Sequence, residues 1–407
     1  MKEVRSGYKR TKVGVIPMEW AVKKLGEIGD SKIGLTYSPD DVVDSKGLLV
    51  LRSSNIRNGS LVYEDNVFVN KEVKEELLTK ENDILICARN GSKSLIGKNA
   101  LITSKAINLT FGAFMSIYRS EYNKFLFQMF QTELYKKQIS INLGATINQI
   151  TTKNLNDFIF PIPPIHEQEK IAEILSTWDS AIEKQEQLIE KKKEFKKGLM
   201  QKLLSGEVRF KEFDDKWKKA KLDNYIEPIS RECGKPSEGY WRLGLRSHGK
   251  GTFHQFVDDP TKVSMDKLYK VKANDLIVNI TFAWEHAIAV ANSEDEDKLV
   301  SHRFPTYEFK ENAYSEYFKY YILQSRFREM LVNISPGGAG RNRVMNKKDF
   351  LKLEVLIPSY DEQKRIAEVL ISSDKEIELL EKELEALKLQ KKGLMQRLLT
   401  GEVRVKV

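Results

Sequence analysis

The segment IPPIHEQEKIAEIL (Ile162–Leu175) returns as IPSYDEQKRIAEVL (Ile357–Leu370), and KKGLMQKLLSGEVR (Lys196–Arg209) returns as KKGLMQRLLTGEVR (Lys391–Arg404). Both pairs are separated by 195 residues, and 26 of the 48 positions from 162 to 209 are identical to their partners without a gap. Two unrelated charged helices would not hold one register over that length. The chain therefore contains an internal duplication, which is the strongest single indication of its architecture.

The segments upstream of the two copies resemble one another more faintly. EWAVKKL (19–25) corresponds to KWKKAKL (216–222), LRS (51–53) to LRS (245–247), and ENDILI (81–86) to ANDLIV (273–278). The offsets drift between 197 and 192, as expected when loops differ in length on a shared scaffold. The order is thus globular unit, long segment, globular unit, long segment, with expected boundaries at 1–160, 161–210, 211–355 and 356–407.

Both repeated segments are predicted to be long helices of about 60 Å, because some 40 residues rise 1.5 Å each. Prolines stop the strand-like run before each one, and Gly206 and Gly401 mark the far ends. The apolar residues alternate by fours and threes, which predicts a coiled-coil seam through Ile171, Leu175, Trp178, Ile182, Ile189, Leu199 and Leu203 and through Ile366, Leu370, Ile377, Leu380, Leu384, Leu387, Leu394 and Leu398. Gln185, Lys192 and Lys196 interrupt the first seam, and Gly198 and Gly393 favour a bend.

A helix of this kind could simply pack against the rest of the chain, with its charged face in solvent and no special role. Two gapless copies favour pseudo-twofold symmetry instead, which would pair the helices antiparallel and place the globular units near opposite ends. That geometry suits a two-part DNA site, because protein symmetry there matches the arrangement of half-sites.

Composition excludes several classes of protein. The 407 residues include 67 Lys and Arg against 58 Asp and Glu, giving a net charge of +9, and 41% are hydrophobic. Two cysteines, Cys87 and Cys233, support neither a disulfide framework nor a four-cysteine zinc site, so a reducing, cytoplasmic setting is expected. The N-terminus lacks a signal-peptide core, and no apolar run is long enough to cross a membrane.

The excess charge lies outside the repeats. Residues 166–209 have no net charge and residues 361–404 carry −1, so the rest of the chain carries +10. Balanced helices suit pairing with each other or with protein partners, and basic globular units suit phosphate binding. The alternative is that this charge only keeps the protein in solution.

Polar and basic loops are the candidate DNA contacts, because the Arg fork matches guanine O6 and N7, and Asn and Gln match adenine N6 and N7. In the first unit the candidates are Arg52, Ser53, Arg57, Arg89, Asn90, Lys93, Asn148, Gln149 and Lys153. In the second unit they are Arg246, His248, Lys250, Asn279, Trp284, Arg341, Arg343 and Lys347. The glycine-rich run at 337–340 would let the backbone approach a duplex closely, or it is a flexible surface loop. Because the two sets differ, we expect two readers of different sequences.

No catalytic motif is present. The only Pro-Pro, at 163–164, lacks the polar and aromatic neighbours of a DNA amino-methyltransferase motif, and residues 91–98 fail the spacing of a phosphate loop. Asp275, Glu296 and Lys298 could be grouped as a nuclease site, but the first unit has no counterpart and the acidic run at 293–297 is typical of a solvated loop. The five histidines show no metal-ligand spacing, so no metal site is predicted. We expect a chain that binds and does not catalyse.

The duplicated IPxPxxEQxxIAxxL-like segment, KKGLMQxLLxGEVR and the opening at Ile16–Trp20 resemble the DNA specificity subunits of type I restriction-modification systems. The resemblance covers essentially the whole chain. It implies an α+β fold with two tandem target recognition domains, each followed by a conserved helix, the two helices forming an antiparallel spacer. It also implies one half of an asymmetric double-stranded DNA site for each domain.

The resemblance further implies two methyltransferase subunits bringing S-adenosylmethionine and two restriction subunits bringing ATP- and Mg²⁺-dependent cleavage, with no cofactor held by this chain. Adenine would be methylated on each strand. The methyltransferase docking residues are expected on the conserved helices, at Glu167, Gln168, Glu173, Glu362, Gln363 and Glu368. Two alternatives stay open, namely a coiled-coil scaffold that assembles proteins without reading DNA, and a self-sufficient nuclease with an unrecognised site.

Overall fold

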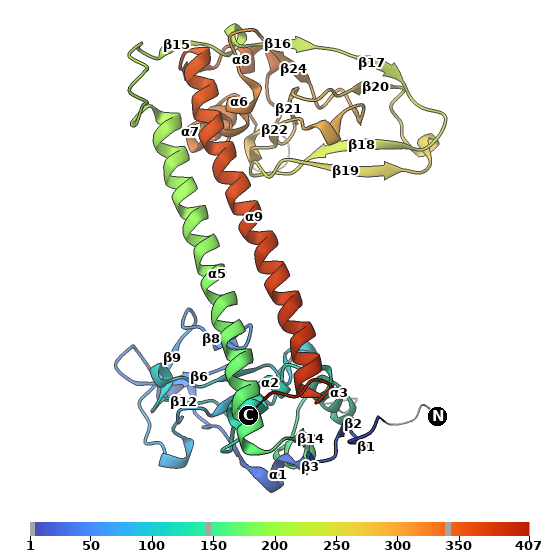
Figure 1. Cartoon of the computed structure of the whole chain (residues 1–407). Helices are drawn as coiled ribbons and strands as arrows, with labels where there is room; N and C mark the ends of the chain where they lie inside the picture. The colour runs from blue at the N-terminus through green and yellow to red at the C-terminus, as the bar shows by residue number, and fades with distance from the viewer. Residues whose placement is uncertain (1–4, 144–147, 338–342, 407) are drawn as a thin grey trace. The chain divides into compact units, whose positions relative to one another are not determined.

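The computed structural model describes residues 5–143, 148–337 and 343–406. The chain divides into two compact units, of which unit 1 comprises residues 1–186 and 382–407 and unit 2 comprises residues 187–381. Each unit combines a globular part of strands and short helices with a segment of both long helices (Figure 1). The expected mixture of helix and strand in two related units is confirmed. The division passes through the long helices, so each helix contributes to both units.

Unit 1 contains two four-stranded sheets. The first has the order β11 (Asn99–Leu101), β10 (Ile84–Cys87), β13 (Met115–Arg119), β4 (Asp30–Ile33), and the second has the order β12 (Thr110–Phe111), β6 (Leu48–Leu51), β9 (Val67–Val69), β5 (Val42–Val43). Three two-stranded pairs complete it, formed by β1 (Tyr8–Thr11) with β2 (Gly14–Pro17), β3 (Ala21–Lys24) with β14 (Ile159–Ile162), and β7 (Ile56–Arg57) with β8 (Ser60–Leu61). Its short helices are α1 (Leu25–Ile28), α2 (Asn123–Met129), α3 (Glu133–Asn142) and α4 (Thr152–Asp157).

Unit 2 has a similar plan, with one four-stranded and one five-stranded sheet. One sheet has the order β16 (Ile226–Ile229), β24 (Thr306–Phe309), β21 (Leu276–Val278), β22 (Ile288–Val290), and the other has the order β17 (Glu232–Gly234), β20 (Lys267–Lys270), β23 (Leu299–Val300), β18 (Tyr240–Leu245), β19 (Thr252–Val257). The pair β15 (Lys218–Lys221) with β25 (Glu354–Ile357) matches β3 with β14. The short helices are α6 (Ser315–Tyr321), α7 (Ser325–Asn333) and α8 (Lys347–Leu351).

The ENDILI and ANDLIV segments form the central strands β10 and β21. Their side chains alternate between two cores: Ile84 and Ile86 belong to the core that packs against the long helices, and Leu85 to a second core on the opposite face. In β21, Leu276 and Ile277 divide in the same way. A strand covered on both faces needs a continuous apolar run, which explains why these segments show no polar alternation.

The two predicted long helices are present as α5 (Ile165–Ser205) and α9 (Tyr360–Leu399). Both end at the expected glycines, since Gly206 and Gly401 have φ of 74° and 72°. Val208 N–H donates to Lys202 O (3.3 Å) and Val403 N–H to Arg397 O (3.1 Å), so both ends use the bond across the last turn that a left-handed glycine permits. Gly198 and Gly393 do not interrupt the helices.

Within each unit, α5 and α9 lie together through the predicted apolar residues, all of which are buried or half-buried. In unit 1, Asp179 pairs with Lys391 and Gln185 Nε2 donates to Glu383 Oε2 (3.1 Å). In unit 2, Lys196 pairs with Asp374, and Lys192 Nζ lies 2.6 Å from Glu376 Oε1. Residue numbers rise along α5 as they fall along α9. The three polar residues that interrupt the first seam therefore meet acidic residues of α9.

Candidate DNA interface

Three loops of unit 1 that the sequence marked as candidates converge. Asn90 Nδ2 donates to Ser53 Oγ (3.1 Å), and Asn90 N–H donates to Asn148 O (3.3 Å). Arg89 and Gln149 form an isolated antiparallel bridge, and the guanidinium of Arg89 lies over the ring of Phe114 at 5.1 Å. Segments separated by almost 100 residues thus present their polar groups on one surface. Lys93 and Lys153 are exposed.

Arg52 and Arg57 are already paired with acidic residues. Arg57 Nη1 and Nη2 bind both carboxylate oxygens of Glu64 at 3.0 and 2.7 Å, across the β7–β8 hairpin. Arg52 Nη2 donates to Asp65 Oδ2 at 2.8 Å. The hydrogen bonds and charge of Glu64 raise the pKa of Arg57, and those of Arg57 lower the pKa of Glu64. DNA phosphates would therefore compete with acidic side chains of the same loop.

The buried amide of Asn55 shapes this loop. Its Oδ1 accepts from Arg52 N–H (2.9 Å), while its Nδ2 donates to Val62 O (3.1 Å) and Asn66 Oδ1 (3.2 Å). Asn55 is 0% exposed, so it holds the loop from inside and does not itself offer groups to a ligand. Glu64 and Asp65 were not candidates from sequence, because only the folded chain brings them onto Arg57 and Arg52.

The candidate loops of unit 2 also converge. Ser247 Oγ donates to Glu285 Oε2 (2.6 Å) and His248 N–H to Glu285 O (2.7 Å), which ties the 246–250 loop to the turn η8 (Ala283–Glu285). Met345 N–H donates to Ile280 O (2.8 Å), which brings in the 343–347 segment. The equivalent bond in unit 1 is Ile150 N–H to Ala88 O, also 2.8 Å. The two units therefore build their loop surfaces on one backbone plan.

The side chains on the unit 2 surface differ from those of unit 1. The guanidinium of Arg343 lies over the ring of Trp284 (5.4 Å), and that of Arg246 over Phe253 (5.3 Å). His248, Lys250 and Lys347 are exposed, with Lys347 Nζ 3.4 Å from His302 O. Asn279 is buried, and its Oδ1 accepts from Thr281 N–H (3.1 Å) and Oγ1 (2.7 Å), so it shapes the loop from inside as Asn55 does. Arg341 lies outside the described residues.

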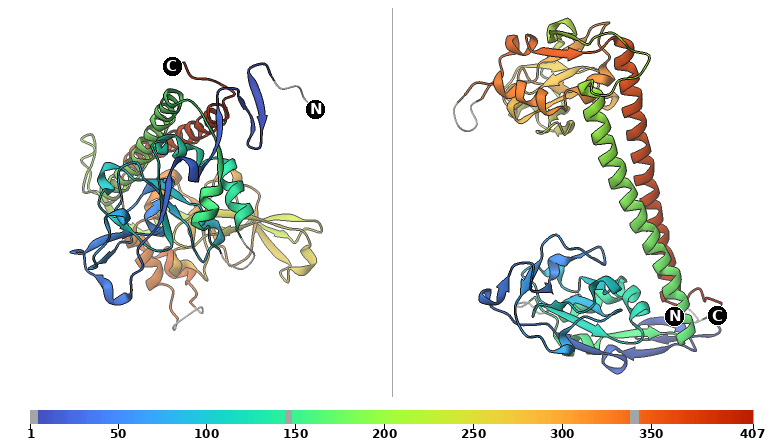
Figure 2. Two further views of the ribbon diagram at one scale, coloured as in Figure 1. Left: turned by 90° about the horizontal axis from the view of Figure 1, so that it is seen from below. Right: turned by 90° about the vertical axis from the view of Figure 1, so that its left-hand side faces the viewer.

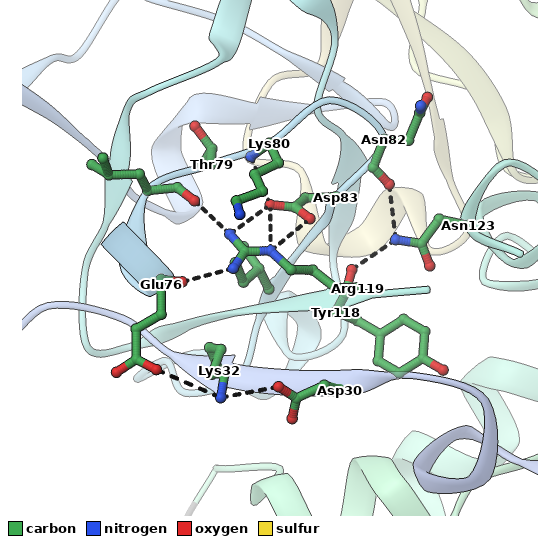
Figure 3. A network of polar contacts seen from close by, with 12 residues as sticks. Asp30, Lys32, Glu76, Thr79, Lys80, Asn82, Asp83, Tyr118, Arg119 and Asn123 are labelled. Carbon is green, nitrogen blue, oxygen red and sulfur yellow. Dashed lines mark hydrogen bonds and ion pairs between the residues drawn. The ribbon is translucent and has the colours of Figure 1, made fainter. Parts of the chain in front are cut away.

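A buried aspartate stands immediately before each central strand and is paired with an arginine. In Figure 3, Arg119 of β13 binds Asp83 with Nε at 2.9 Å and reaches the carbonyl of Glu76 with Nη1 at 2.8 Å. In unit 2, Arg231 binds both oxygens of Asp275. Each aspartate also accepts a 2.8 Å bond from the backbone N–H three residues earlier. Asp275 is 2% exposed and both of its oxygens are bound by Arg231, so it does not present a free carboxylate at the surface.

No metal cluster accompanies these loops, since within the described ranges no three His, Cys, Asp or Glu side chains gather closely enough to hold an ion. His286 is buried, and its Nε2 hydrogen-bonds Ile322 O at 2.6 Å. Burial lowers the pKa of His286, which favours the neutral ring. None of the described helices is both long and apolar enough to cross a membrane.

The expected docking residues at the start of each long helix divide into two groups. Glu167, Gln168, Glu362 and Gln363 are at most 3% exposed, so a partner subunit does not reach them in this conformation, and that expectation is corrected. Glu167 accepts from Arg404 Nε (2.6 Å) and Trp20 Nε1 (3.0 Å), whereas Gln168 Nε2 donates to Pro163 O. Glu173 and Glu368, which follow them by five or six residues, are exposed.

The same arrangement holds unit 2 together. Glu362 accepts from Arg209 Nε and Nη2 at 2.9 and 2.8 Å, and from Trp217 Nε1 at 3.1 Å. In each unit, then, the glutamate of one repeat pairs with the arginine that closes the other repeat. Sequence reasoning aligned Trp20 with Trp217 but missed these pairs, because nothing local links a residue with a partner more than 150 positions away.

Two globular parts with matching scaffolds and different loops, joined by long helices with equivalent contacts, define a duplicated recognition protein. The family model described as "Type I restriction modification DNA specificity domain" matches residues 17–191 and 240–389, most of the chain. The chain belongs to this family.

Known relatives agree with that membership. The type I restriction enzyme MjaVIII specificity subunit of Methanocaldococcus jannaschii is 26% identical over 96% of this chain and 94% of that protein. The type I restriction enzyme EcoKI specificity subunit of Escherichia coli (strain K12) is 31% identical over 50% of this chain and 46% of that protein. A crystal structure of a type I restriction-modification system S subunit from M. genitalium shares the fold, with a TM-score of 0.55, 15% identity and 98% of both chains covered.

Proposed function

We propose that this chain is the DNA-reading subunit of a type I restriction-modification complex, in which each globular part reads one half of an asymmetric two-part site on double-stranded DNA. The observation that carries the proposal is the convergence of three polar loops in each unit, on a shared backbone plan but with different side chains. Arg89, Asn90 and Gln149 offer one pattern of donors and acceptors, and Arg246, His248 and Arg343 another. Different patterns read different base edges in the major groove.

Affinity would come from the basic charge outside the helices, because neutralising phosphates releases counterions and makes binding salt-dependent. The helices α5 and α9, paired as an antiparallel coiled coil with pseudo-twofold symmetry, would be the spacer between the two readers. A spacing of about 34 Å corresponds to one turn of DNA, so helix length would set how many unread base pairs separate the half-sites.

Catalysis would belong to the partners. Two methyltransferase subunits would bind S-adenosylmethionine and flip the target adenine out of the duplex, and two restriction subunits would use ATP and Mg²⁺. The chain itself would bind no cofactor and would not catalyse. Glu173 and Glu368 are the docking candidates that are exposed on α5 and α9.

The test is to express the chain with and without its methyltransferase partner in a host that lacks other adenine methylation, and to sequence the modified bases. Methylation at a single two-part motif, present only when both proteins are expressed, is the expected result. A continuous motif, or the same motif without this chain, would contradict the proposal. If the purified chain also shows no salt-dependent DNA binding, a protein scaffold is the better interpretation. Metal-dependent cleavage by the purified chain alone would indicate a nuclease instead.

A further inference from the structure

Asp179 of α5 connects three elements of unit 1. Its Oδ1 pairs with Nζ of Lys391 on α9, and its Oδ2 accepts a 2.9 Å hydrogen bond from Nε2 of Gln128 on α2. One carboxylate therefore holds the opposite long helix with one oxygen and the globular part with the other. The Lys391 side chain is only 11% exposed, so its charge is largely enclosed by this contact.

Asp374 of α9 does the same in unit 2. Its Oδ1 pairs with Nζ of Lys196 on α5, and its Oδ2 accepts a 2.7 Å hydrogen bond from the hydroxyl of Tyr320 on α6. Lys196 Nζ also lies over the Tyr320 ring at 5.4 Å. Burial and the neighbouring carboxylate raise the pKa of Tyr320, so its hydroxyl stays protonated and donates.

The two contacts are equivalent in sequence as well as in geometry. Asp179 and Asp374 are 195 residues apart, as are Lys196 and Lys391, and both residue types are kept in both copies. The third partner lies at equivalent positions of α2 and α6, but there the residue types differ. What the duplication preserves is thus a carboxylate with two donors, one from a helix and one from a globular part.

Apolar packing alone would not fix the orientation of each globular part. Ile171, Leu175 and Leu398 join the helices to the core of unit 1, and Ile366 and Leu370 do so in unit 2. Apolar attraction is non-directional, so such a contact tolerates small rotations and slides. A charged acceptor with two donors at fixed angles does not, because charge-assisted hydrogen bonds weaken when their geometry is lost.

We propose that Asp179 and Asp374 are positioning residues that fix the orientation of each globular part on the helices of its own unit, and so set the number of base pairs allowed between the two half-sites. The second step rests on the proposed function. One base pair advances the duplex by about 3.4 Å. A small rotation of one globular part is therefore enough to allow a spacer that is one base pair longer or shorter.

The first experiment does not depend on DNA. Spin labels at Lys136→Cys on α3 and Lys184→Cys on α5, in a Cys233→Ser background, report the distance between the globular part and the helix of unit 1. Asp179→Ala should widen the distance distribution, because a charge-assisted contact of defined geometry is lost. The matched control is Glu186→Ala, because Glu186 pairs with Lys388 of α9 at 2.9 Å and lies on the same helix. An unchanged width in Asp179→Ala, or equal widening in the control, would overturn the proposal.

The second experiment measures spacing with a library of sites whose half-sites are constant and whose spacer length varies. With the methyltransferase partner, Asp179→Ala and Asp374→Ala should raise methylation at spacers one base pair longer or shorter by about tenfold relative to the preferred length. Half-site bases should not change. The control is Glu376→Ala, which removes an ion pair between α5 and α9 in unit 2.

The outcomes separate the two proposals. If the unaltered chain directs no methylation, the proposed function fails, and the distance measurement still decides the positioning role. If the distances widen but spacer selectivity is unchanged, the link to spacing is wrong. Should Asp179→Ala fail to fold, Asp179→Asn removes the charge while keeping the size, and the same two readouts apply. Uniform loss of methylation at all spacers with unchanged distances would indicate a purely structural role and overturn the proposal.

Discussion

Arg404 and Glu167 lie 237 positions apart in the sequence, and their side chains form an ion pair with contacts of 2.6 and 2.9 Å. Glu19 adds a second acceptor for Arg404 at 2.7 Å, and the two carboxylates raise the pKa of that guanidinium. Tyr8 also donates from its hydroxyl to Gly401 O (2.7 Å), and the hairpin β1–β2 lies beside the C-terminal segment in both views of Figure 2. Residues 400–405 are thus an integral part of the folded unit 1.

The first prediction concerns Glu167→Ala. The substitution leaves Arg404 and Trp20 Nε1 without their buried acceptor, so unit 1 should lose about 2–4 kcal/mol of unfolding free energy, less than for a fully buried pair because Arg404 is partly exposed. Urea unfolding measures the change. Glu169→Ala, an exposed neighbour, should stay within about 0.5 kcal/mol. Equal effects of the two substitutions would show that the pair does not stabilise the unit.

The second prediction concerns Glu64→Gln, which frees Arg57 in the β7–β8 hairpin. One more unpaired cation would meet the phosphates, so DNA affinity should rise. In a plot of log affinity against log salt concentration, the slope should become steeper by about one. Fluorescence anisotropy at several salt concentrations gives both values. Glu75→Gln makes the same charge change at an exposed residue and should alter the slope much less. If the slope becomes no steeper than in this control, Arg57 is not part of the DNA interface.

The third prediction concerns Arg343→Ala, which removes the guanidinium that lies over Trp284. If Arg343 reads a base, affinity for the correct site should fall by about 1–3 kcal/mol, and discrimination should relax in one half-site only. Competition between sites with single substitutions measures both effects. Arg326→Ala removes the same charge from an exposed position on α7 and should not change discrimination. Relaxed discrimination in both half-sites would contradict assignment of this loop to one reader.

The fourth prediction concerns His286, whose pKa is lowered mainly by burial. Because the unfolded ring has a pKa near 6.5, the unfolded chain binds more protons than the folded one just below that pH. Stability of unit 2 should therefore fall as pH drops from about 7.5 through 6.5 toward the lower folded pKa, and level off below it. His286→Asn, which suits the φ of 66°, should flatten this part of the melting profile, while His302→Asn at an exposed position should not. If the pH dependence of the melting temperature is unchanged in His286→Asn, this loss of stability does not come from His286.

The sequence alone predicted the parts of the fold that depend on local patterns. The duplicated heptads, the prolines before them and Gly206 and Gly401 after them gave the two long helices and their ends, because each signal acts within a few residues. The polar interruptions at Lys192 and Lys196 were correctly located but not explained. Their acidic partners on α9 are about 180 residues away, and no local pattern connects them.

The candidate interface was predictable as loops but not as contacts. Ser53, Asn90 and Asn148 were each selected for side-chain chemistry, and the fold brings them together. Burial was the main error, since Glu167 and Glu362 look like exposed helix residues in a charged sequence. Each buried carboxylate is stabilised by a tryptophan of its own copy and by an arginine of the other repeat, and such pairing is a property of the tertiary structure.

The division of the molecule has a consequence for its synthesis. Unit 2 is one uninterrupted stretch, 187–381, whereas unit 1 needs residues 382–407 as well as 1–186. During synthesis, the Glu167 carboxylate can bind Trp20 but lacks its arginine partner until Arg404 has been translated. A premature stop codon shortly after residue 381 would therefore leave unit 2 complete but deprive unit 1 of its C-terminal segment, so a truncation at the end of the chain would destabilise the part that is translated first.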